Sequence, residues 1–219
     1  IRDSPFLYQD AQQFRDTMDD ETVFRFYEEK YQDKGFELIG FFDQGMRQMT
    51  SNIKGQSPDD MQGQKIRVME NQLHISIWQA LGANPTPMAF SEVYMALQQG
   101  TIDAQENPLS VITSSRFNEV QDYLSMTEHV YSAAPLMVSK AAYDALPDDL
   151  KAIVDEAGTE ACQWEREYLA EVEVQWLDEL EAAGTQINYP DKAPFVEAMS
   201  SVYLSLIHIS EPTRPRLIS

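Results

Sequence analysis

The pattern of apolar and polar positions predicts alternating helices and strands along most of this chain. Ser4–Asp19 and Thr22–Gln32 show the apolar spacing of amphipathic helices, and Ser4 is the expected N-cap of the first. Phe36–Phe42 is a compact apolar run that predicts a buried strand, and Arg47–Asn52 predicts a second, more polar strand. Because strands alternate with helices, we expect an α/β fold with parallel strand pairing.

The same pattern continues beyond these elements. Ala83–Pro87 contains two prolines and is expected to be irregular, because proline removes a backbone donor. The other predicted strands are Lys65–Val68, Ile102–Gln105, Tyr123–Met126, Tyr131–Ser139 and Gln186–Tyr189, and the other predicted helices are Asn71–Leu81, Glu92–Gln99, Leu109–Arg116, Lys140–Ala145 and Pro194–Tyr203.

Asp148–Ala183 is the longest predicted element. It contains no proline, and Gly158 is its only glycine. At about 1.5 Å per residue such a helix spans about 50 Å, which exceeds the width of a small domain. A helix of this length is therefore expected to join two lobes or to brace both.

The final stretch, Ser205–Ser219, differs abruptly in composition and carries Arg214 and Arg216 between prolines. It is interpreted as a non-native tail and excluded from the fold prediction. A natural proline-rich tail is the alternative.

Composition and charge narrow the function classes. The 219 residues are 43% hydrophobic and 11% aromatic, which is typical of a globular protein, and the net charge is −20. Such a charge repels nucleic acid and an anionic membrane face, so neither is an expected partner. The sequence contains no run of about 18 apolar residues, so no transmembrane helix is expected. No signal peptide is visible, but Ile1 is not an initiator residue, so the chain can begin within a longer protein.

The sequence offers few candidates for catalysis. Cys162 is the only cysteine, and the three histidines are scattered at His74, His129 and His208. No nucleophile, phosphate-loop or HExxH pattern occurs, and the acidic pairs sit at predicted helix starts, where the helix dipole favours them. We therefore expect no catalytic residue, no metal site and no cofactor, and a protein that is not an enzyme.

Arginine and amide side chains near predicted strand ends suggest an anion site instead. Arg67 lies in a short apolar strand, and a buried arginine needs a partner, either a ligand carboxylate or an internal acid such as Asp103 or Glu106. Asn107 precedes a proline and could present its amide to a ligand or serve as a turn residue. Two further candidates have equally open alternatives: Phe90 is a ligand platform or a core residue, and Arg47 a second cation of the site or a surface arginine.

Several segments together resemble the solute-binding proteins of TRAP transporters (tripartite ATP-independent periplasmic transporters), the DctP-like group. The likeness covers roughly Ser4 to Tyr203 and is densest from Gly63 to Tyr131. The matching segments are GFELIGFFDQGMRQMTSN, MQGQKIRVMEN, ALGANPTPMAFSEVYMALQQGTIDAQENPL, FNEVQDYLSMTEHVY and PLMVSKAAYDALPDDLKAIVDEAG.

The resemblance implies an α/β two-lobe clamp, like a periplasmic binding protein, with a long bridging helix and one incomplete lobe. Residues 1–44 and 133–172 would form the incomplete lobe I, which lacks its N-terminal part, and residues 45–132 and 173–204 would form lobe II. It further implies that Arg67 forms a salt bridge with the ligand carboxylate, that Asn107 reaches the same group, that Phe90 packs near the ligand and that Arg47 is a second basic residue of the site.

By the same resemblance, the protein is expected to be periplasmic. It would capture a small organic acid and deliver it to membrane TRAP transport subunits. A ligand-sensing module that presents the acid to a receptor is the alternative on the same fold. C4-dicarboxylates, uronates, sialic acids and 2-oxo acids all carry the carboxylate that Arg67 would bind, so the acid itself stays open.

Overall fold

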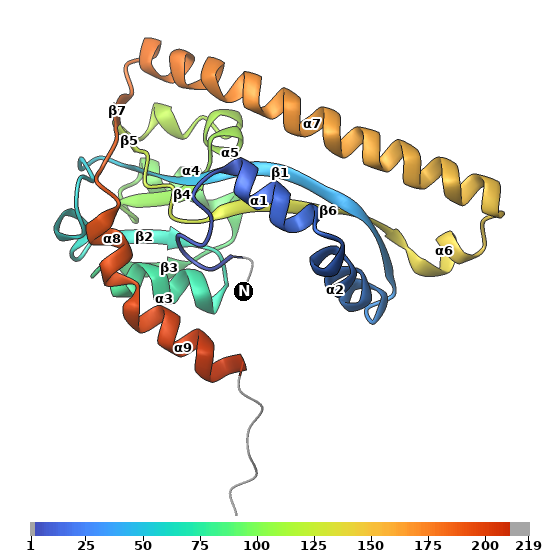
Figure 1. Cartoon of the computed structure of the whole chain (residues 1–219). Coiled ribbons are helices and arrows are strands. Elements are labelled where there is room, and N and C mark those ends of the chain that lie inside the picture. Colours follow the sequence, from blue (N-terminus) through green and yellow to red (C-terminus); the bar gives the residue numbers. More distant parts are fainter. Residues whose placement is uncertain (1–2, 211–219) are drawn as a thin grey trace, which may run out of the picture.

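The computed structural model describes residues 3–210 and shows a mixed α/β fold (Figure 1). The strands are β1 (Phe36–Ser51), β2 (Lys65–Val68), β3 (Asn84–Pro87), β4 (Ala104–Pro108), β5 (Tyr123–Ser125), β6 (Tyr131–Ser139) and β7 (Gln186–Asn188). The α-helices are α1 (Ala11–Asp19), α2 (Glu21–Gln32), α3 (Gln72–Ala80), α4 (Val93–Gln98), α5 (Leu109–Ser114), α6 (Lys140–Asp144), α7 (Asp148–Ala182), α8 (Ala193–Ala198) and α9 (Ser200–Ser210). Short 3-10 turns occur at η1 (Pro58–Met61), η2 (Phe90–Glu92) and η3 (Phe117–Glu119).

Strand β1 runs through both halves of the molecule. Its first part pairs with β6, and its last five residues, Arg47–Ser51, pair with β4 and β5. The two strands expected at Phe36–Phe42 and Arg47–Asn52 are therefore one strand, which corrects the prediction. The polar residues between them do not form a turn. They form an irregularity at Asp43–Gly45, where Gly45 adopts a φ of 83°, and such a bulge bends a strand without ending it.

The strand order is β3-β2-β4-β1-β5-β7, with β6 on the other part of β1. Parallel pairing, as expected, joins β2 to β3 and β4, and β5 to β7. The expectation is wrong for β1, which is antiparallel to all three of its neighbours. A second expectation, that Ala83–Pro87 is irregular, is also wrong, because most of this segment forms β3. This strand stands at the edge of the sheet, where a proline needs to donate no ladder hydrogen bond.

Helix α1 begins later than the sequence pattern predicts. Asp10, not Ser4, is its N-cap, and the Asp10 carboxylate accepts a hydrogen bond from the Gln13 backbone N–H at 2.8 Å. The preceding segment is held instead by the Phe6 backbone N–H, which donates to the carbonyl of His129 at 2.8 Å. A long-range backbone contact thus replaces the expected first helical turn.

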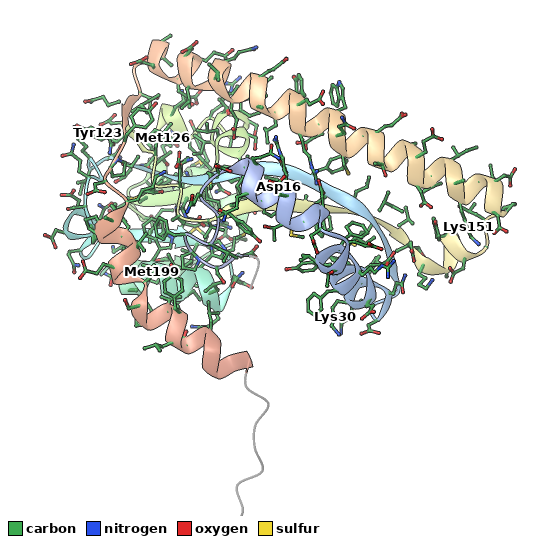
Figure 2. All side chains as sticks on the ribbon, viewed as in Figure 1. Asp16, Lys30, Tyr123, Met126, Lys151 and Met199 are labelled. Carbon is green, nitrogen blue, oxygen red and sulfur yellow. The ribbon has the colours of Figure 1, made fainter. Side chains whose placement is uncertain are left out.

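Helix α7 has the predicted extent to within one residue. It runs along β1 and β6 from α6 to β7 (Figure 1), and Lys151, near its start, lies at the opposite end of the molecule from Tyr123 of β5 (Figure 2). Gly158 lets the helix approach β1, because a Cβ at this position would lie 2.2 Å from Cγ2 of Ile39. The one break in the helical pattern therefore marks a close contact between helix and strand.

Three hydrophobic clusters hold these elements. One lies between the sheet and α3, α8 and α9 around Trp78 and Phe195, and a second lies between the sheet, α4, α5 and the end of α7 around Phe117. A third joins α1 and α2 to the β1–β6 pair around Phe14 and Phe41. The first two sandwich the larger part of the sheet, which gives the strand ends of β2 and β4 a rigid support.

The late helix expected at Pro194–Tyr203 is split into α8 and α9. Helix α9 continues to Ser210, and Leu206 packs against the first hydrophobic cluster. The first residues of the expected non-native tail thus continue a helix, and residues 211–219 lie outside the described residues. Within residues 3–210 we find no helix that combines the length and the apolar character required to cross a membrane.

We predict that Gly158→Ala destabilises the protein, although alanine is the better helix former by about 1 kcal/mol. The added methyl group would meet Ile39 and force α7 away from β1, at a cost of about 1–3 kcal/mol. Urea denaturation would measure the difference in free energy of unfolding. Gln163→Ala, on the exposed face of the same helix, is the matched control and should be neutral or slightly stabilising. A more stable Gly158→Ala variant would refute the close contact.

Candidate ligand-binding site

The topology brings the candidate residues to one edge of the sheet. Strands β2 and β4 are parallel neighbours, so their carboxyl ends, with Arg67 and Asn107, lie at the same edge. Strand β1 is antiparallel to β4 and places Arg47 opposite Pro108. Phe90 begins the 3-10 turn η2, shortly after the end of β3. All four predicted site residues are thus close together.

Arg67 is buried but has no acidic partner. The residue is only 4% exposed, and its Nε and Nη2 donate to the carbonyl oxygen of Met88 at 3.1 and 2.9 Å. No carboxylate of residues 3–210 lies within 4.0 Å of the guanidinium. Burial lowers the pKa of Arg67 from its usual value, which reflects the cost of keeping this charge away from water.

The internal acids weighed as alternative partners of Arg67 are engaged elsewhere. The carboxylate of Asp103 accepts a hydrogen bond from the backbone N–H of Lys65 at 2.7 Å. Glu106 pairs with Arg47. The internal-acid alternative therefore does not describe Arg67.

Arg47 is neither a free cation nor a surface arginine. Its guanidinium binds the Glu106 carboxylate with two hydrogen bonds, from Nε to Oε2 at 2.5 Å and from Nη2 to Oε1 at 3.0 Å. Both residues are buried, and Glu106 is 0% exposed. This two-point geometry is the one in which arginine binds carboxylates most strongly, so the positive charge of Arg47 is compensated within the protein.

The sequence analysis missed the histidines that complete this cluster. His129 Nε2 lies 2.9 Å from Oε2 of Glu106, and His74 Nδ1 lies 3.4 Å from Oε1. Burial alone would raise the pKa of Glu106, but Arg47 and the two histidines outweigh it and hold that pKa well below its usual range. Burial lowers the pKa of His129, against the attraction of Glu106. We therefore assign an ionised Glu106 and a neutral His129 at neutral pH.

Asn107 is oriented by the same cluster. Its Oδ1 accepts from Nη2 of Arg47 at 3.0 Å, and its Nδ2 donates to Oε1 of Gln105 at 2.6 Å. Gln105 in turn donates to Oγ1 of Thr50 at 2.9 Å. With Oδ1 fixed by a cation, Nδ2 has a defined direction, and a primary amide retains a second N–H hydrogen for a further acceptor.

Phe90 covers the guanidinium of Arg67. The Cζ atom of Arg67 lies 5.7 Å from the centre of the Phe90 ring, a cation–π distance, and the ring is 49% exposed. Phe117 packs against the same ring in a T-shaped arrangement, with the centroids 6.1 Å apart. Phe90 is thus a supported but accessible aromatic surface next to a buried cation, rather than a core residue.

A second charged group lies where β1 bends. Arg15 of α1 donates to Asp43 at 2.7 Å, and the backbone N–H of Asp43 donates to Glu165 of α7 at 2.9 Å. The Glu173 carboxylate lies against Gly45, at a point that a Cβ would occupy. The group is linked to the ligand-site candidates through Ser132, which pairs with Gly45 in the sheet and accepts from Nη1 of Arg47 at 3.3 Å.

A cavity of about 460 Å³ lies between α1, β1 and α7. Arg15, Gly45, Tyr131 and Glu173 are among its lining residues. None of the four candidate residues lines it: Met46 and Gln48, the strand neighbours of Arg47, face this cavity, and alternate strand residues point to opposite faces. Among residues 3–210, no group of three His, Cys, Asp or Glu side chains could hold a metal ion.

We predict a pH-dependent stability effect at Glu173. Burial, with the negative charge of Asp43, raises the pKa of Glu173 from 4.5 to about 7, and Arg15 only partly opposes this. A carboxyl group with a raised pKa in the folded state disfavours folding as it ionises, so the cost is absent at low pH and complete above about pH 7. After allowance for solvent screening we expect a cost of about 1 kcal/mol.

Glu173→Gln should therefore raise the melting temperature by about 2–4 °C at pH 8 and leave it nearly unchanged at pH 5. Thermal unfolding at the two pH values checks this. Glu171→Gln, an exposed change on the same helix, is the control and should show no such difference. An equal effect of Glu173→Gln at both pH values would contradict the burial of an ionising carboxyl.

Comparison with known proteins agrees with this architecture. The sequence model of the family described as bacterial extracellular solute-binding protein, family 7, matches residues 1–208. A solute-binding protein of Verminephrobacter eiseniae is 41% identical over 209 residues, which cover 92% of this chain and 61% of that protein. The 2,3-diketo-L-gulonate-binding periplasmic protein of Escherichia coli is 33% identical, with 92% of this chain and 62% of that protein covered.

A solved TRAP periplasmic solute-binding protein from Bordetella, whose ligand density was assigned to pantoate, superposes with a TM-score of 0.89 at 38% identity. The match covers 95% of this chain and 69% of that one. The expected fold class, an α/β clamp with a long bridging helix, is confirmed by this match. The chain spans about three fifths of the length of the two curated relatives.

Proposed function

Because the chain belongs to the family of bacterial extracellular solute-binding proteins, family 7, we propose that it captures a small organic acid anion in the periplasm for TRAP-type transport. Its partners would be the acid and the membrane subunits of the transporter. The relatives are substrate-binding proteins, and we propose that this chain likewise binds its acid without transforming it. No observation on the described residues favours the sensing module over transport.

The observation that carries the proposal is the unpaired charge of Arg67. A buried guanidinium without a carboxylate partner is costly, and an incoming carboxylate would supply the missing negative charge. Each charge-assisted hydrogen bond would contribute about 1.5–3 kcal/mol. Met88 holds the guanidinium through Nε and Nη2, which leaves Nη1 without a hydrogen bond to a described residue.

The neighbouring residues would complete the site. Asn107 would donate its remaining amide hydrogen to the same carboxylate, in the orientation that Arg47 imposes. Phe90 would pack against the carbon chain of the acid while it shields the Arg67 charge. Arg47 would act mainly by holding Asn107, since its own charge is matched by Glu106. The ligands named for the relatives, 2,3-diketo-L-gulonate and pantoate, both carry a carboxylate.

We further propose that the molecule closes around its ligand by bending where β1 bends. Residues 1–44 with 133–172, and 45–132 with 173–204, would move as two lobes. The first boundary falls within the irregularity at Asp43–Gly45, the second between the β6 residues that pair with it, and the third beside Glu173. Closure would exclude water from Arg67 and strengthen its ion pair with the ligand.

Arg67→Ala should abolish or strongly weaken organic acid binding. Loss of two charge-assisted hydrogen bonds predicts a rise in Kd of about 100-fold or more. Isothermal titration calorimetry with D-glucuronate, pantoate and succinate would measure it, with circular dichroism to confirm folding. Arg67→Lys keeps the charge but loses the planar fork, so an intermediate affinity is expected.

Arg25→Ala removes the same charge from the exposed surface of α2 and serves as the control, with no expected change in Kd. Unaltered affinity in Arg67→Ala would show that the acid binds elsewhere.

A further inference from the structure

We propose that the ligand is a monocarboxylate whose remaining groups are neutral, and that Glu106 is the residue that determines this preference. The inference rests on the proposed function, because it assumes that Arg67 binds the carboxylate. It narrows the ligand from organic acids in general to those with a single negative charge.

The argument begins with the count of charges in the site. Arg47 and Glu106 form a two-point ion pair within the protein and together contribute no net charge. Glu106 is completely buried and keeps its negative charge, because a cation and two imidazoles surround it. If Glu106 were absent, the site would offer two arginine charges to a ligand instead of one.

His129 does not add a positive charge at neutral pH. His129 is 1% exposed, and burial lowers its pKa. Its Nδ1 lies 2.8 Å from the Thr127 hydroxyl, which can donate to it when Nε2 carries the hydrogen that points to Glu106. A neutral tautomer thus satisfies both ring nitrogens.

Arg67 therefore remains as the one buried cation among the described residues with no carboxylate within ion-pair distance, and Glu106 attracts it only at longer range. The other arginines and several lysines of residues 3–210 have acidic partners, and Lys34, Lys54 and Lys65, which have none, are exposed. Arg15, which lies beside the bend in β1, pairs with Asp43. One carboxylate neutralises Arg67, and a second carboxylate on the same ligand would find no partner there.

A second carboxylate would also be repelled. The chain carries a net charge of −20, which repels anions. The repulsion energy is proportional to the charge of the ligand, so it is twice as large for a dianion as for a monoanion. A hydroxyl or carbonyl group has no such penalty and can use the amide of Asn107, while Phe90 offers an apolar surface to carbon–hydrogen groups. The site thus favours a single carboxylate followed by neutral carbon and oxygen groups.

Matched pairs of acids test this directly. D-Erythronate and meso-tartrate, and D-gluconate and D-glucarate, differ only in whether the far end is an alcohol or a carboxylate. Calorimetry on the chain at pH 7.5 should give a Kd at least 10-fold lower for the monocarboxylate of whichever pair binds. Equal or tighter binding of the dicarboxylate would overturn the inference and leave the proposed function standing. Binding of none of the four, nor of D-glucuronate, pantoate or succinate, would contradict the proposed function itself.

Glu106→Gln tests the role of Glu106. The variant frees the charge of Arg47, so the preference for the monocarboxylate should shrink by about 10-fold or reverse. A purely structural role would weaken both acids of a pair equally and leave their ratio unchanged, which would refute the assignment. Glu171→Gln changes charge on the exposed face of α7 and should preserve the ratio. If Glu106→Gln does not fold, the ratio within each pair on the unaltered chain still decides the ligand class.

Discussion

The buried ion pair between Arg47 and Glu106 is the interaction on which the candidate site depends. It links β1 to β4 at the carboxyl end of β4, where Arg47 lies opposite Pro108. It also orients Asn107 and removes Glu106 as a partner for Arg67. Breaking such a pair leaves an uncompensated buried charge, which typically costs about 3–5 kcal/mol. Removing either partner would therefore destabilise the strand arrangement, and the pairing leaves one arginine free for an external anion.

The same pair connects the site to the bend in β1. Arg47 reaches Ser132 on β6, and Ser132 pairs with Gly45, where the long strand is bent and where Glu173 of α7 packs. A ligand that binds Asn107 would thus contact a residue that is linked through Arg47 and Ser132 to the bend in β1, the long strand that runs through the molecule (Figure 1). Helix α7, which packs along β1, keeps the two parts in contact on either side of this bend.

Local patterns in the sequence predicted the elements whose causes are local. The extent of α7, the bounds of α3 to within one residue of the predicted Asn71–Leu81, and the short strand at Lys65–Val68 follow from helix signals and apolar spacing. The start of α1 was missed because it depends on a backbone contact between Phe6 and His129.

The single strand β1 was missed for a related reason: a polar Asp-Gln-Gly run is typical of a turn, and only pairing with β6 makes it a bulge. In the site, the four candidate residues could be selected from the sequence with the help of the family resemblance. Their division of roles could not, because the choice of Arg47 over Arg67 as the partner of Glu106 depends on long-range geometry. The sequence also did not indicate that the two histidines lie together, since 54 residues separate them in the chain.

The most direct test of the central assignment is an NMR titration of the arginine side-chain Nε–H signals with an organic acid. The Arg67 signal, identified by its loss in Arg67→Lys, should shift on binding, while the Arg47 signal, fixed by Glu106, should move little. Binding that shifts the Arg47 signal and leaves that of Arg67 in place would contradict the account.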